Sequence, residues 1–294
     1  MNLNPRLAER MFGENTKLHQ FVVSTEEDLK DLCTDERIAW LQAFRFGEVV
    51  LWGDYLYADG VTPSIGATNG QSWPVHYVYK TAVQELVADA HARCCHAGIR
   101  FCGYIHPDRW REQYRAATGS YNGVGRSIIA EVERQAWDGA MIDGSQFSFQ
   151  RQEVICTLLK LGSDGMSMSL HQSIPGWANP DEGYCNVGLL ASLPRYVMTG
   201  ETNKVAPASL DDPMWRHEIG FNWLGGSTIG MYKPNKSTDQ GRYWDEHREE
   251  WYPRLPEWGC IARATRWTLE ERGTWLTHYW PAYELARRGA AAVV

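Results

Sequence analysis

One short stretch, residues 137–144, constrains the fold more than any other part of this 294-residue chain. It reads Trp-Asp-Gly-Ala-Met-Ile-Asp-Gly, so an apolar run at 140–142 is followed by Asp143 and Gly144. The residues before it, 124–136, place apolar side chains at the spacing of one helix face. A helix, a short turn and a buried strand with a polar end are typical of β/α proteins, whose functional groups lie where strands end. An Asp-Gly pair after a strand is also a common turn, so both interpretations stay open here.

The same alternation of helix and strand patterns runs along the rest of the chain. Short apolar runs indicate eight strands, at residues 21–23, 48–52, 99–104, 140–142, 166–170, 196–199, 227–232 and 289–294. Strands that alternate with helical segments predict a parallel sheet with helical crossovers, which is an α/β fold. Eight of them favour a closed (β/α)8 TIM barrel over an open sheet. We therefore expect a single barrel domain over residues 1–294, with residues 1–18 as an N-terminal extension.

Three further segments carry structural expectations. Residues 75–97 have an amphipathic pattern that predicts one long helix, residues 107–122 look like a polar, aromatic loop, and residues 240–286 look helical. The chain ends on its eighth predicted strand. Two explanations remain open: the barrel lacks its last helix and loop, or the chain is a piece of a longer protein.

Composition excludes several classes of partner. The chain is 44% hydrophobic and 22% charged, with a net charge of −7 and no long basic run, which argues against a nucleic-acid partner. No apolar run approaches the roughly 18 residues of a membrane span, and the first residues lack the apolar core of a signal peptide. The seven cysteines form no Cys-x-x-Cys motif, so we interpret them as reduced thiols. Together these features predict a cytoplasmic protein that does not contact a membrane.

Motifs for metal and cofactor chemistry are missing from the sequence. It has no His-x-His pair, no His-Glu-x-x-His motif, no phosphate-binding Walker loop and no Gly-x-Ser-x-Gly nucleophile elbow. We therefore expect no metal and no cofactor.

Polar or ionisable residues follow six of the eight predicted strands. In a β/α barrel the residues just past the strand ends line the active site. Here those positions hold Asp54, His106, Asp143, His171, Glu201 and Lys233. Loops of any β/α protein are polar, yet this concentration favours a site role for Asp143.

Two carboxylates that face one cavity suit glycoside hydrolysis, in which one attacks the anomeric carbon and the other protonates the leaving oxygen. Strand order favours Asp143 and Glu201 as this catalytic pair, with Asp54 as the competing acid. His106, His171 and Lys233 would then bind the substrate. Four aromatic residues could supply stacking surfaces for a sugar ring, although each could equally belong to the core: Trp52, Tyr104, Trp177 and Tyr232.

The middle of the chain resembles the α-L-fucosidase-type family of retaining glycoside hydrolases. Residues 98–104, Gly-Ile-Arg-Phe-Cys-Gly-Tyr, are similar to a family strand that reads roughly Gly-Leu-Lys-Phe-Gly-Leu-Tyr, and residues 137–144 resemble a later strand that ends Trp-Phe-Asp-Gly. Residues 226–232, Gly-Ser-Thr-Ile-Gly-Met-Tyr, are loosely similar to the family's Ser-Trp-Gly-Tyr strand. The resemblance implies a TIM barrel, a fucosyl-like carbohydrate substrate and Asp143 as the nucleophile. The family's histidine pair after strand two is replaced here by Trp52-Gly53-Asp54.

Two other functions fit the same residues. A sugar-binding barrel that kept the fold and lost the chemistry would share the aromatic residues and the strand ends. A β/α lyase or isomerase would use a carboxylate and a histidine as acid and base. Turnover of an aryl glycoside distinguishes the three.

Overall fold

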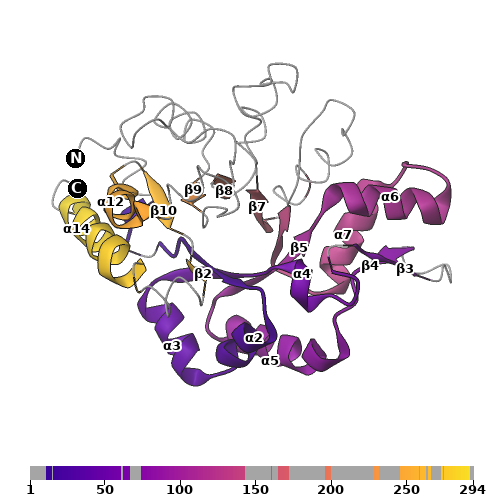
Figure 1. Ribbon diagram of the computed structural model, residues 1–294, viewed down its shortest axis with the longest axis horizontal. Helices are drawn as coiled ribbons and strands as arrows, with labels where there is room; N and C mark the ends of the chain where they lie inside the picture. Colours follow the sequence, from indigo (N-terminus) through magenta and orange to yellow (C-terminus); the bar gives the residue numbers. More distant parts are fainter. Residues whose placement is uncertain are drawn as a thin grey trace, which may run out of the picture. The chain divides into compact units, whose positions relative to one another are not determined.

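The computed structural model describes somewhat more than half of the chain (Figure 1). The described residues are 11–14, 16–60, 62–66, 74–142, 160, 165–171, 196–199, 228–231, 246–257, 259–262, 264–265, 273 and 275–291. The chain divides into two compact units, residues 22–171 and residues 1–21 with 172–294, and each is considered by itself below. None of the helices in the described residues is long and apolar enough to cross a lipid bilayer. That one domain contains both units stays a prediction.

The unit of residues 22–171 alternates strands and helices. Its elements are β1 (His19–Val23, which begins in the other unit), α2 (Glu26–Leu32), α3 (Asp35–Ala43), β2 (Phe46–Leu51), α4 (Gly53–Leu56), β3 (Ser64–Ile65), β4 (Val75–His76), a 3-10 turn η1 (Thr81–Val83), α5 (Gln84–His96), β5 (Arg100–Ile105), α6 (Pro107–Thr118), α7 (Val124–Arg134), β6 (Gly139–Ile142) and β7 (Ser167–His171). The strands lie in the order β7-β6-β5-β2-β1. The pairs β2–β5, β5–β6 and β6–β7 are parallel, which confirms the predicted α/β class.

Local sequence explains where the first helices of this unit begin. Thr25 accepts a hydrogen bond from the backbone of Asp28, whose carboxylate in turn accepts from the backbone N–H of Thr25, and this capping box begins α2. Thr34 caps α3 in the same way through the backbone N–H of Arg37. Helix α3 packs against β2 and α5 against β5, and Figure 1 shows α2, α3 and α5 along the same side of these strands. The helices therefore cover one side of β2 and β5.

Gly139 of the motif and Gly103 of β5 allow unusually close packing. A Cβ at Gly103 of β5 would collide with the indole ring of Trp137, and one at Gly139 would collide with the backbone carbonyl of Ser167 in β7. Gly139 pairs with Ser167 in the parallel register, so the two strands approach at a point where a side chain does not fit. The Trp-Asp-Gly part of the motif is therefore needed for packing.

Asp138 joins β5 to the start of β6. Its backbone N–H donates to the carbonyl of Phe101 at 2.9 Å, and the backbone N–H of Phe101 donates to its Oδ2 at 2.8 Å. Asp138 thus satisfies both the backbone N–H and the backbone carbonyl of Phe101. This reciprocal pair fixes β6 against β5 at its amino end.

The other unit combines parallel strands with an aromatic C-terminal segment. Its described elements are β8 (Tyr196–Thr199), β9 (Thr228–Met231), α12 (Arg248–Trp251), a 3-10 turn η5 (Tyr252–Arg254), β10 (Cys260–Ala262), β11 (Ala264–Thr265), a π-helical turn η6 (Trp275–Tyr279) and α14 (Trp280–Ala291). Strand β9 pairs in parallel with both β8 and β10.

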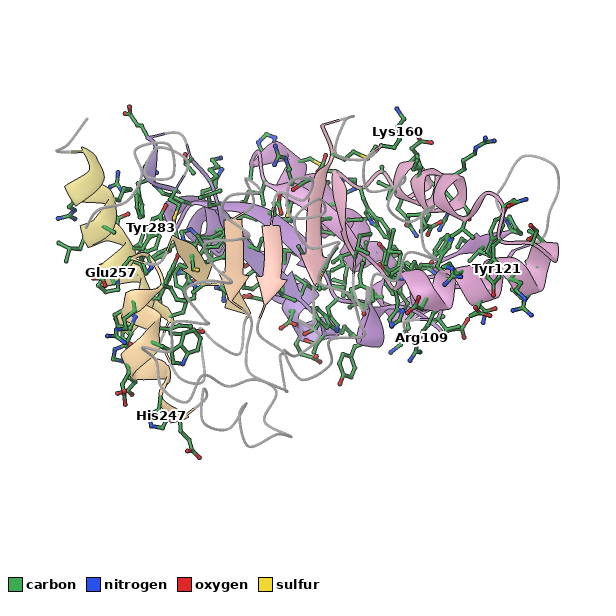
Figure 2. The ribbon with its side chains drawn as sticks, turned by 90° about the horizontal axis from the view of Figure 1, so that it is seen from above. Arg109, Tyr121, Lys160, His247, Glu257 and Tyr283 are labelled. Atoms are coloured by element: carbon green, nitrogen blue, oxygen red, sulfur yellow. The ribbon has the colours of Figure 1, made fainter. Side chains whose placement is uncertain are left out.

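The N-terminal segment packs into this aromatic part of the same unit. The buried ring of His19 lies among four aromatic rings, with centroid distances of 4.7–5.6 Å: Trp275, Tyr279, Trp280 and Tyr283. His19 Nε2 lies 2.9 Å from the hydroxyl of Tyr279, and the hydroxyl of Tyr283, labelled in Figure 2, donates to the carbonyl of Met11 at 2.7 Å. Much of the tryptophan and tyrosine in the C-terminal segment therefore serves as core.

Most predicted strands are confirmed within a residue or two, but the strand predicted at 289–294 is wrong. Helix α14 runs through Gly289 to Ala291. Alanine has the highest helix propensity, and a short apolar run cannot be assigned to a strand or to a buried helix by periodicity alone. Strand β10 (Cys260–Ala262), which was not predicted, pairs in parallel with β9 instead, and a closed (β/α)8 barrel stays a prediction.

Three further expectations need correction. The predicted loop at 107–122 holds α6, which a proline at its first position and buried Trp110 and Tyr114 favour once the four-residue spacing is considered. The predicted helix at 75–97 begins only at Gln84, because the preceding residues form β4 and an extended segment. Strand β10 lies inside the segment predicted to be helical, where it is only three residues long.

The described cysteines are all free thiols, which agrees with the sequence prediction. Cys94, Cys102 and Cys260 are buried. Burial raises the pKa of Cys94 to about 12 and that of Cys33 to about 11, so both thiols are protonated near neutral pH. These two cysteines are therefore poor nucleophiles.

The two glycine environments predict opposite stability changes. Gly139→Ala inserts a methyl group into the backbone of β7 and should lower the free energy of unfolding by about 1–3 kcal/mol. Gly289→Ala in α14 meets no neighbour and should raise it by about 0.5–1 kcal/mol, because alanine favours a helix. Urea unfolding followed by circular dichroism measures both changes. A stable Gly139→Ala variant would contradict the close approach of β6 and β7, and a destabilised Gly289→Ala variant would contradict the helix.

Candidate active site at the strand ends

The carboxyl ends of β5, β6 and β7 lie level with one another, and β2 ends about two residues earlier in the register. Val50 pairs with Cys102, and Ile142 pairs with both Ile105 and Leu170. The next residues along the chain are His106 after β5 and His171 at the end of β7. Because neighbouring parallel strands run in one direction, the residues that follow them leave the same edge of the sheet. Two of the predicted site residues are therefore attached to one edge.

Trp52 and Tyr104 pack against each other at this edge. Their ring centroids lie 5.3 Å apart at an angle of 42°. Trp52 is 9% exposed and Tyr104 is 1% exposed. A Cβ at Gly53 would press on the ring of Tyr104, so the chain leaves β2 tightly against this aromatic pair. These contacts give both rings a packing role, and the predicted contact with a sugar stays a prediction.

His106 begins helix α6. Its Nδ1 accepts a hydrogen bond from the backbone N–H of Arg109 at 3.4 Å, and its own backbone N–H donates to the hydroxyl of Tyr77 at 3.1 Å. Histidine is not a usual N-cap, but Pro107 sets the helical φ angle at the first position. The imidazole is partly exposed, so it is anchored at one nitrogen and in contact with solvent.

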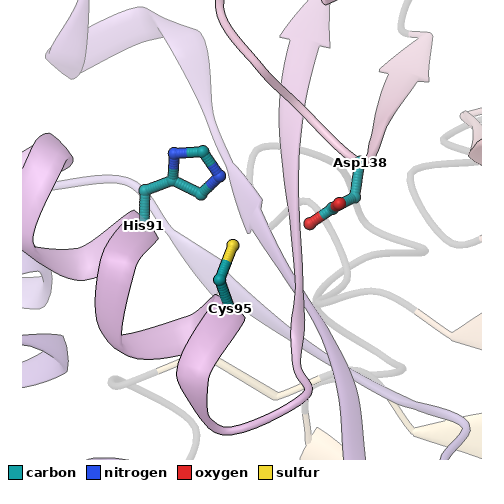
Figure 3. Close-up of side chains that lie close together, drawn as sticks. All are labelled: His91, Cys95 and Asp138. Atoms are coloured by element: carbon teal, nitrogen blue, oxygen red, sulfur yellow. The ribbon is translucent and has the colours of Figure 1, made fainter.

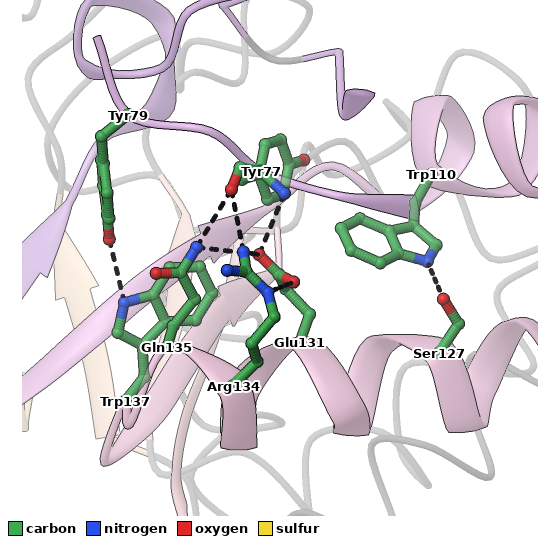
Figure 4. Close-up of polar contacts among 8 residues, drawn as sticks. All are labelled: Tyr77, Tyr79, Trp110, Ser127, Glu131, Arg134, Gln135 and Trp137. Carbon is green, nitrogen blue, oxygen red and sulfur yellow. Dashed lines mark hydrogen bonds and ion pairs between the residues drawn. The ribbon is translucent and has the colours of Figure 1, made fainter. Parts of the chain in front are cut away.

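Three stacked tyrosines support this position. The rings of Tyr57 and Tyr77 lie 4.5 Å apart at 21°, and those of Tyr57 and Tyr79 lie 5.1 Å apart at 28°. The indole N–H of Trp137 donates to the hydroxyl of Tyr79 at 3.1 Å (Figure 4). Burial raises the pKa of the Tyr57 phenol well above its usual value, so it stays neutral. The stack is a rigid apolar support next to the strand ends.

A buried carboxylate holds the backbone of Tyr77. Glu131 of α7, which is 2% exposed, accepts from the Tyr77 backbone N–H at 2.9 Å, from the Arg134 guanidinium at 2.7 Å and from the Gln135 side chain at 2.9 Å (Figure 4). Arg134 and Gln135 also donate to the carbonyl of Tyr77. Both backbone groups of the buried Tyr77 are thereby satisfied. The network connects α7 to the hydroxyl that anchors His106.

The remaining predicted site residues are placed less fully. Asp54 is the second residue of α4, and His171 is the last residue of β7. Asp143, Trp177, Glu201, Tyr232 and Lys233 lie outside the described residues. Their roles stay predictions.

Two exposed residues near the strand ends were not identified from the sequence. Tyr55 of α4 directly follows Asp54 and is 62% exposed. Arg109 of α6, labelled in Figure 2, is exposed and donates to Thr62 Oγ1 at 3.2 Å. Both residues lie in the first helical turn, farther along the chain than the first polar residue after each strand. An exposed ring and a guanidinium both suit contact with sugar hydroxyls and ring faces.

Comparisons with known proteins find distant structural likeness only. No protein-family model and no curated protein matches the chain. Among solved structures, it resembles a family 10 endo-β-1,4-xylanase from Gloeophyllum trabeum, with 9% identity, 87% of this chain and 86% of that chain covered, and a TM-score of 0.48. A maltogenic α-amylase from Thermotoga neapolitana has 10% identity, coverages of 86% and 68%, and a TM-score of 0.47.

A third solved structure is the second catalytic domain of a group II chitinase from Ostrinia furnacalis, with 10% identity and a TM-score of 0.43. It is matched over 72% of this chain and 63% of its own, so the chain spans less than two thirds of that domain. At TM-scores below 0.5 and identities near one tenth, these likenesses establish neither a family nor an activity for this chain.

The Glu131 network predicts a large stability difference between two glutamates of one helix. Glu131→Ala leaves the Tyr77 N–H and the buried part of Arg134 without their acceptor, so the free energy of unfolding should fall by about 2–4 kcal/mol. Glu133→Ala removes an exposed carboxylate from the same helix and should change it by less than about 0.5 kcal/mol. Urea midpoints of the two variants make the comparison, and equal midpoints would show that the network does not hold Tyr77.

Proposed function

We propose that this chain is a retaining glycoside hydrolase in which Asp143 is the nucleophile and Glu201 is the acid and base. The observation that carries the proposal is strand β6. It is a fully buried parallel strand between β5 and β7, and the residue that follows its last residue, Ile142, is Asp143. A carboxylate directly after a central parallel strand is the usual position of a catalytic group in a β/α enzyme.

Covalent geometry limits how far Asp143 can lie from the described strand ends. Consecutive Cα atoms are about 3.8 Å apart, so its Cα lies within one such step of Ile142. Ile142 pairs with Ile105 and Leu170, which are followed by His106 and His171. The proposal therefore gives Asp143 two histidines as neighbours. N–H donors near a carboxylate favour its ionised form, which a nucleophile requires.

The proposed reaction has two steps. Asp143 attacks the anomeric carbon while the Glu201 carboxylic acid protonates the leaving oxygen, which gives a covalent glycosyl-enzyme. Water then attacks the anomeric carbon and the Asp143 carboxylate leaves, while the Glu201 carboxylate takes the proton of the water. To hold its proton before the first step Glu201 needs an apolar surrounding, for which Trp177 or Trp223 is the expected wall. A separation of about 5–5.5 Å between the two carboxyl groups is what retention requires.

The proposed substrate is a terminal sugar of the α-L-fucosyl type, which follows from the resemblance at residues 98–144. This chain has Trp52-Gly53-Asp54 where that family has its histidine pair. We propose that helix α4 takes over this contact, with Asp54 binding hydroxyls and the exposed ring of Tyr55 stacking on the sugar. The aromatic pair beneath, Trp52 and Tyr104, would support α4.

Turnover of a panel of 4-nitrophenyl glycosides, including the α-L-fucoside, tests the activity. Asp143→Asn should lower kcat by at least about 10³-fold, because an amide cannot form the glycosyl-enzyme. Asp35→Asn is the matched control, since Asp35 lies at the start of α3 with a side chain that is 99% exposed. That variant should keep wild-type turnover.

Azide tests the role of the carboxylate directly. Asp143→Gly should regain turnover in azide and release a glycosyl azide, because azide replaces the missing nucleophile. Near wild-type turnover of Asp143→Gly without azide would show the assignment to be wrong, and Asp54 would become the better candidate. Saturable sugar binding without turnover by the wild-type chain would instead support the non-catalytic sugar-binding barrel.

A further inference from the structure

Three different metal-ligating side chains meet on the unit of residues 22–171, away from the proposed active site. His91 and Cys95 lie one turn apart on α5, and Asp138 comes from the turn before β6 (Figure 3). One ligand atom of each, an imidazole nitrogen, the thiol sulfur and a carboxylate oxygen, lie within 4.8 Å of one another. Residues four apart share one face of a helix, so the spacing presents both α5 side chains to the same point.

A single residue of β5, Phe101, orients two of these side chains. The His91 ring stacks on the Phe101 ring, with centroids 5.0 Å apart and an angle of 25°. Phe101 also exchanges two backbone hydrogen bonds with Asp138, which fixes the carboxylate through its Oδ2. Cys95 is placed by the tight connection that follows α5, in which the Ile99 N–H donates to the carbonyl of Cys94 at 2.9 Å. The three groups are therefore held from two separate elements before any ligand arrives.

These groups keep their ligand atoms available. Within the part of the chain that the structure describes, the His91 ring, the Cys95 thiol and Asp138 Oδ1 make no hydrogen bond. Cys95 and Asp138 are exposed and His91 is half-buried, so a cation and water can reach the site. In the described residues, the Asp138 carboxylate accepts its hydrogen bond from the Phe101 N–H through Oδ2.

We propose that His91, Cys95 and Asp138 bind a divalent cation of the Zn²⁺ class, with water as the fourth ligand. Thiolate and imidazole ligands select Zn²⁺ over the oxygen-seeking Mg²⁺ and Ca²⁺. A thiolate and a carboxylate also supply two negative charges to balance the cation. Tetrahedral Zn²⁺ would bring its ligand atoms to roughly 3.3–3.8 Å from one another. The present separations of up to 4.8 Å would then shorten by about 1.5 Å at most.

The position of this site gives it a structural role. Asp138 precedes β6, whereas the proposed nucleophile follows the other end of the strand, five residue steps or roughly 16 Å along an extended chain. A bound cation would add a link between the last turn of α5 and the start of β6, beside the tight α5–β5 connection and the Phe101 contacts. The proposal does not depend on the glycosidase function.

Metal titration of the full chain tests the site. The protein is purified under reducing conditions, treated with a chelator and dialysed. One equivalent of Co²⁺ should then give an intense ultraviolet thiolate-to-metal absorption and visible bands of a tetrahedral complex, and Zn²⁺ should displace it. His91→Gln, Cys95→Ser and Asp138→Asn should each weaken Zn²⁺ binding at least about tenfold. Asp138→Asn keeps a side-chain oxygen as acceptor for the Phe101 N–H, so loss of binding in this variant separates metal ligation from folding.

Two substitutions serve as matched controls. His96→Gln changes an exposed histidine of the same helix, and Cys33→Ser changes a partly exposed cysteine outside the group, so both should keep wild-type Zn²⁺ affinity. Zn²⁺ should raise the Tm of the wild type and of both controls, but not that of Cys95→Ser. Absence of the thiolate band, or equal Zn²⁺ affinity of the wild type and Cys95→Ser, would overturn the proposal.

Discussion

The two hydrogen bonds between Asp138 and Phe101 are the constraint on which much of the described unit depends. They fix β6 against β5 at the amino end, and with Gly139 packed onto the Ser167 carbonyl they leave one possible register for three strands. A register shift by one residue would turn every buried side chain of β6 to the opposite face. The level strand ends therefore follow from contacts made at the far end of the same strands. The motif at 137–144 therefore begins with residues that pack and pair, such as Asp138 and Gly139, before it reaches the candidate nucleophile.

A second constraint acts from outside the sheet. Tyr77 follows the short strand β4, and Glu131, Arg134 and Gln135 of the α7 end satisfy its buried backbone N–H and carbonyl. The phenol of Tyr77 then anchors the backbone of His106. Helix α7 thus influences the strand-end edge without contributing a residue to it. Its own amphipathic pattern, which predicts a helix, gives no sign of this second role.

The sequence predicts the parts of the fold that depend on local pattern. Buried strands such as β5 and β6 are recognisable because apolar runs end at glycine or at a polar residue. The missed elements are those in which two patterns compete: α6 is polar enough to resemble a loop, and the alanines of α14 are as apolar as a strand. Glu131, which the helical pattern assigns to the polar side, is buried for a reason that only the three-dimensional contacts reveal. The cluster of His91, Cys95 and Asp138 was missed because its third member lies 43 residues beyond Cys95.

Strand β6 separates the proposed cation site from the proposed nucleophile. At its amino end, Asp138 is held in place by backbone hydrogen bonds, so a cation there would add stability to a geometry that already exists. The proposed nucleophile, Asp143, follows the carboxyl end of the strand, where we expect loss of a carboxylate to cost the core little. Substitution of the first should therefore change unfolding and metal affinity, whereas substitution of the second should change turnover alone. This asymmetry follows from the direction of a parallel strand, because stability is concentrated at the amino end and reactive groups at the carboxyl end.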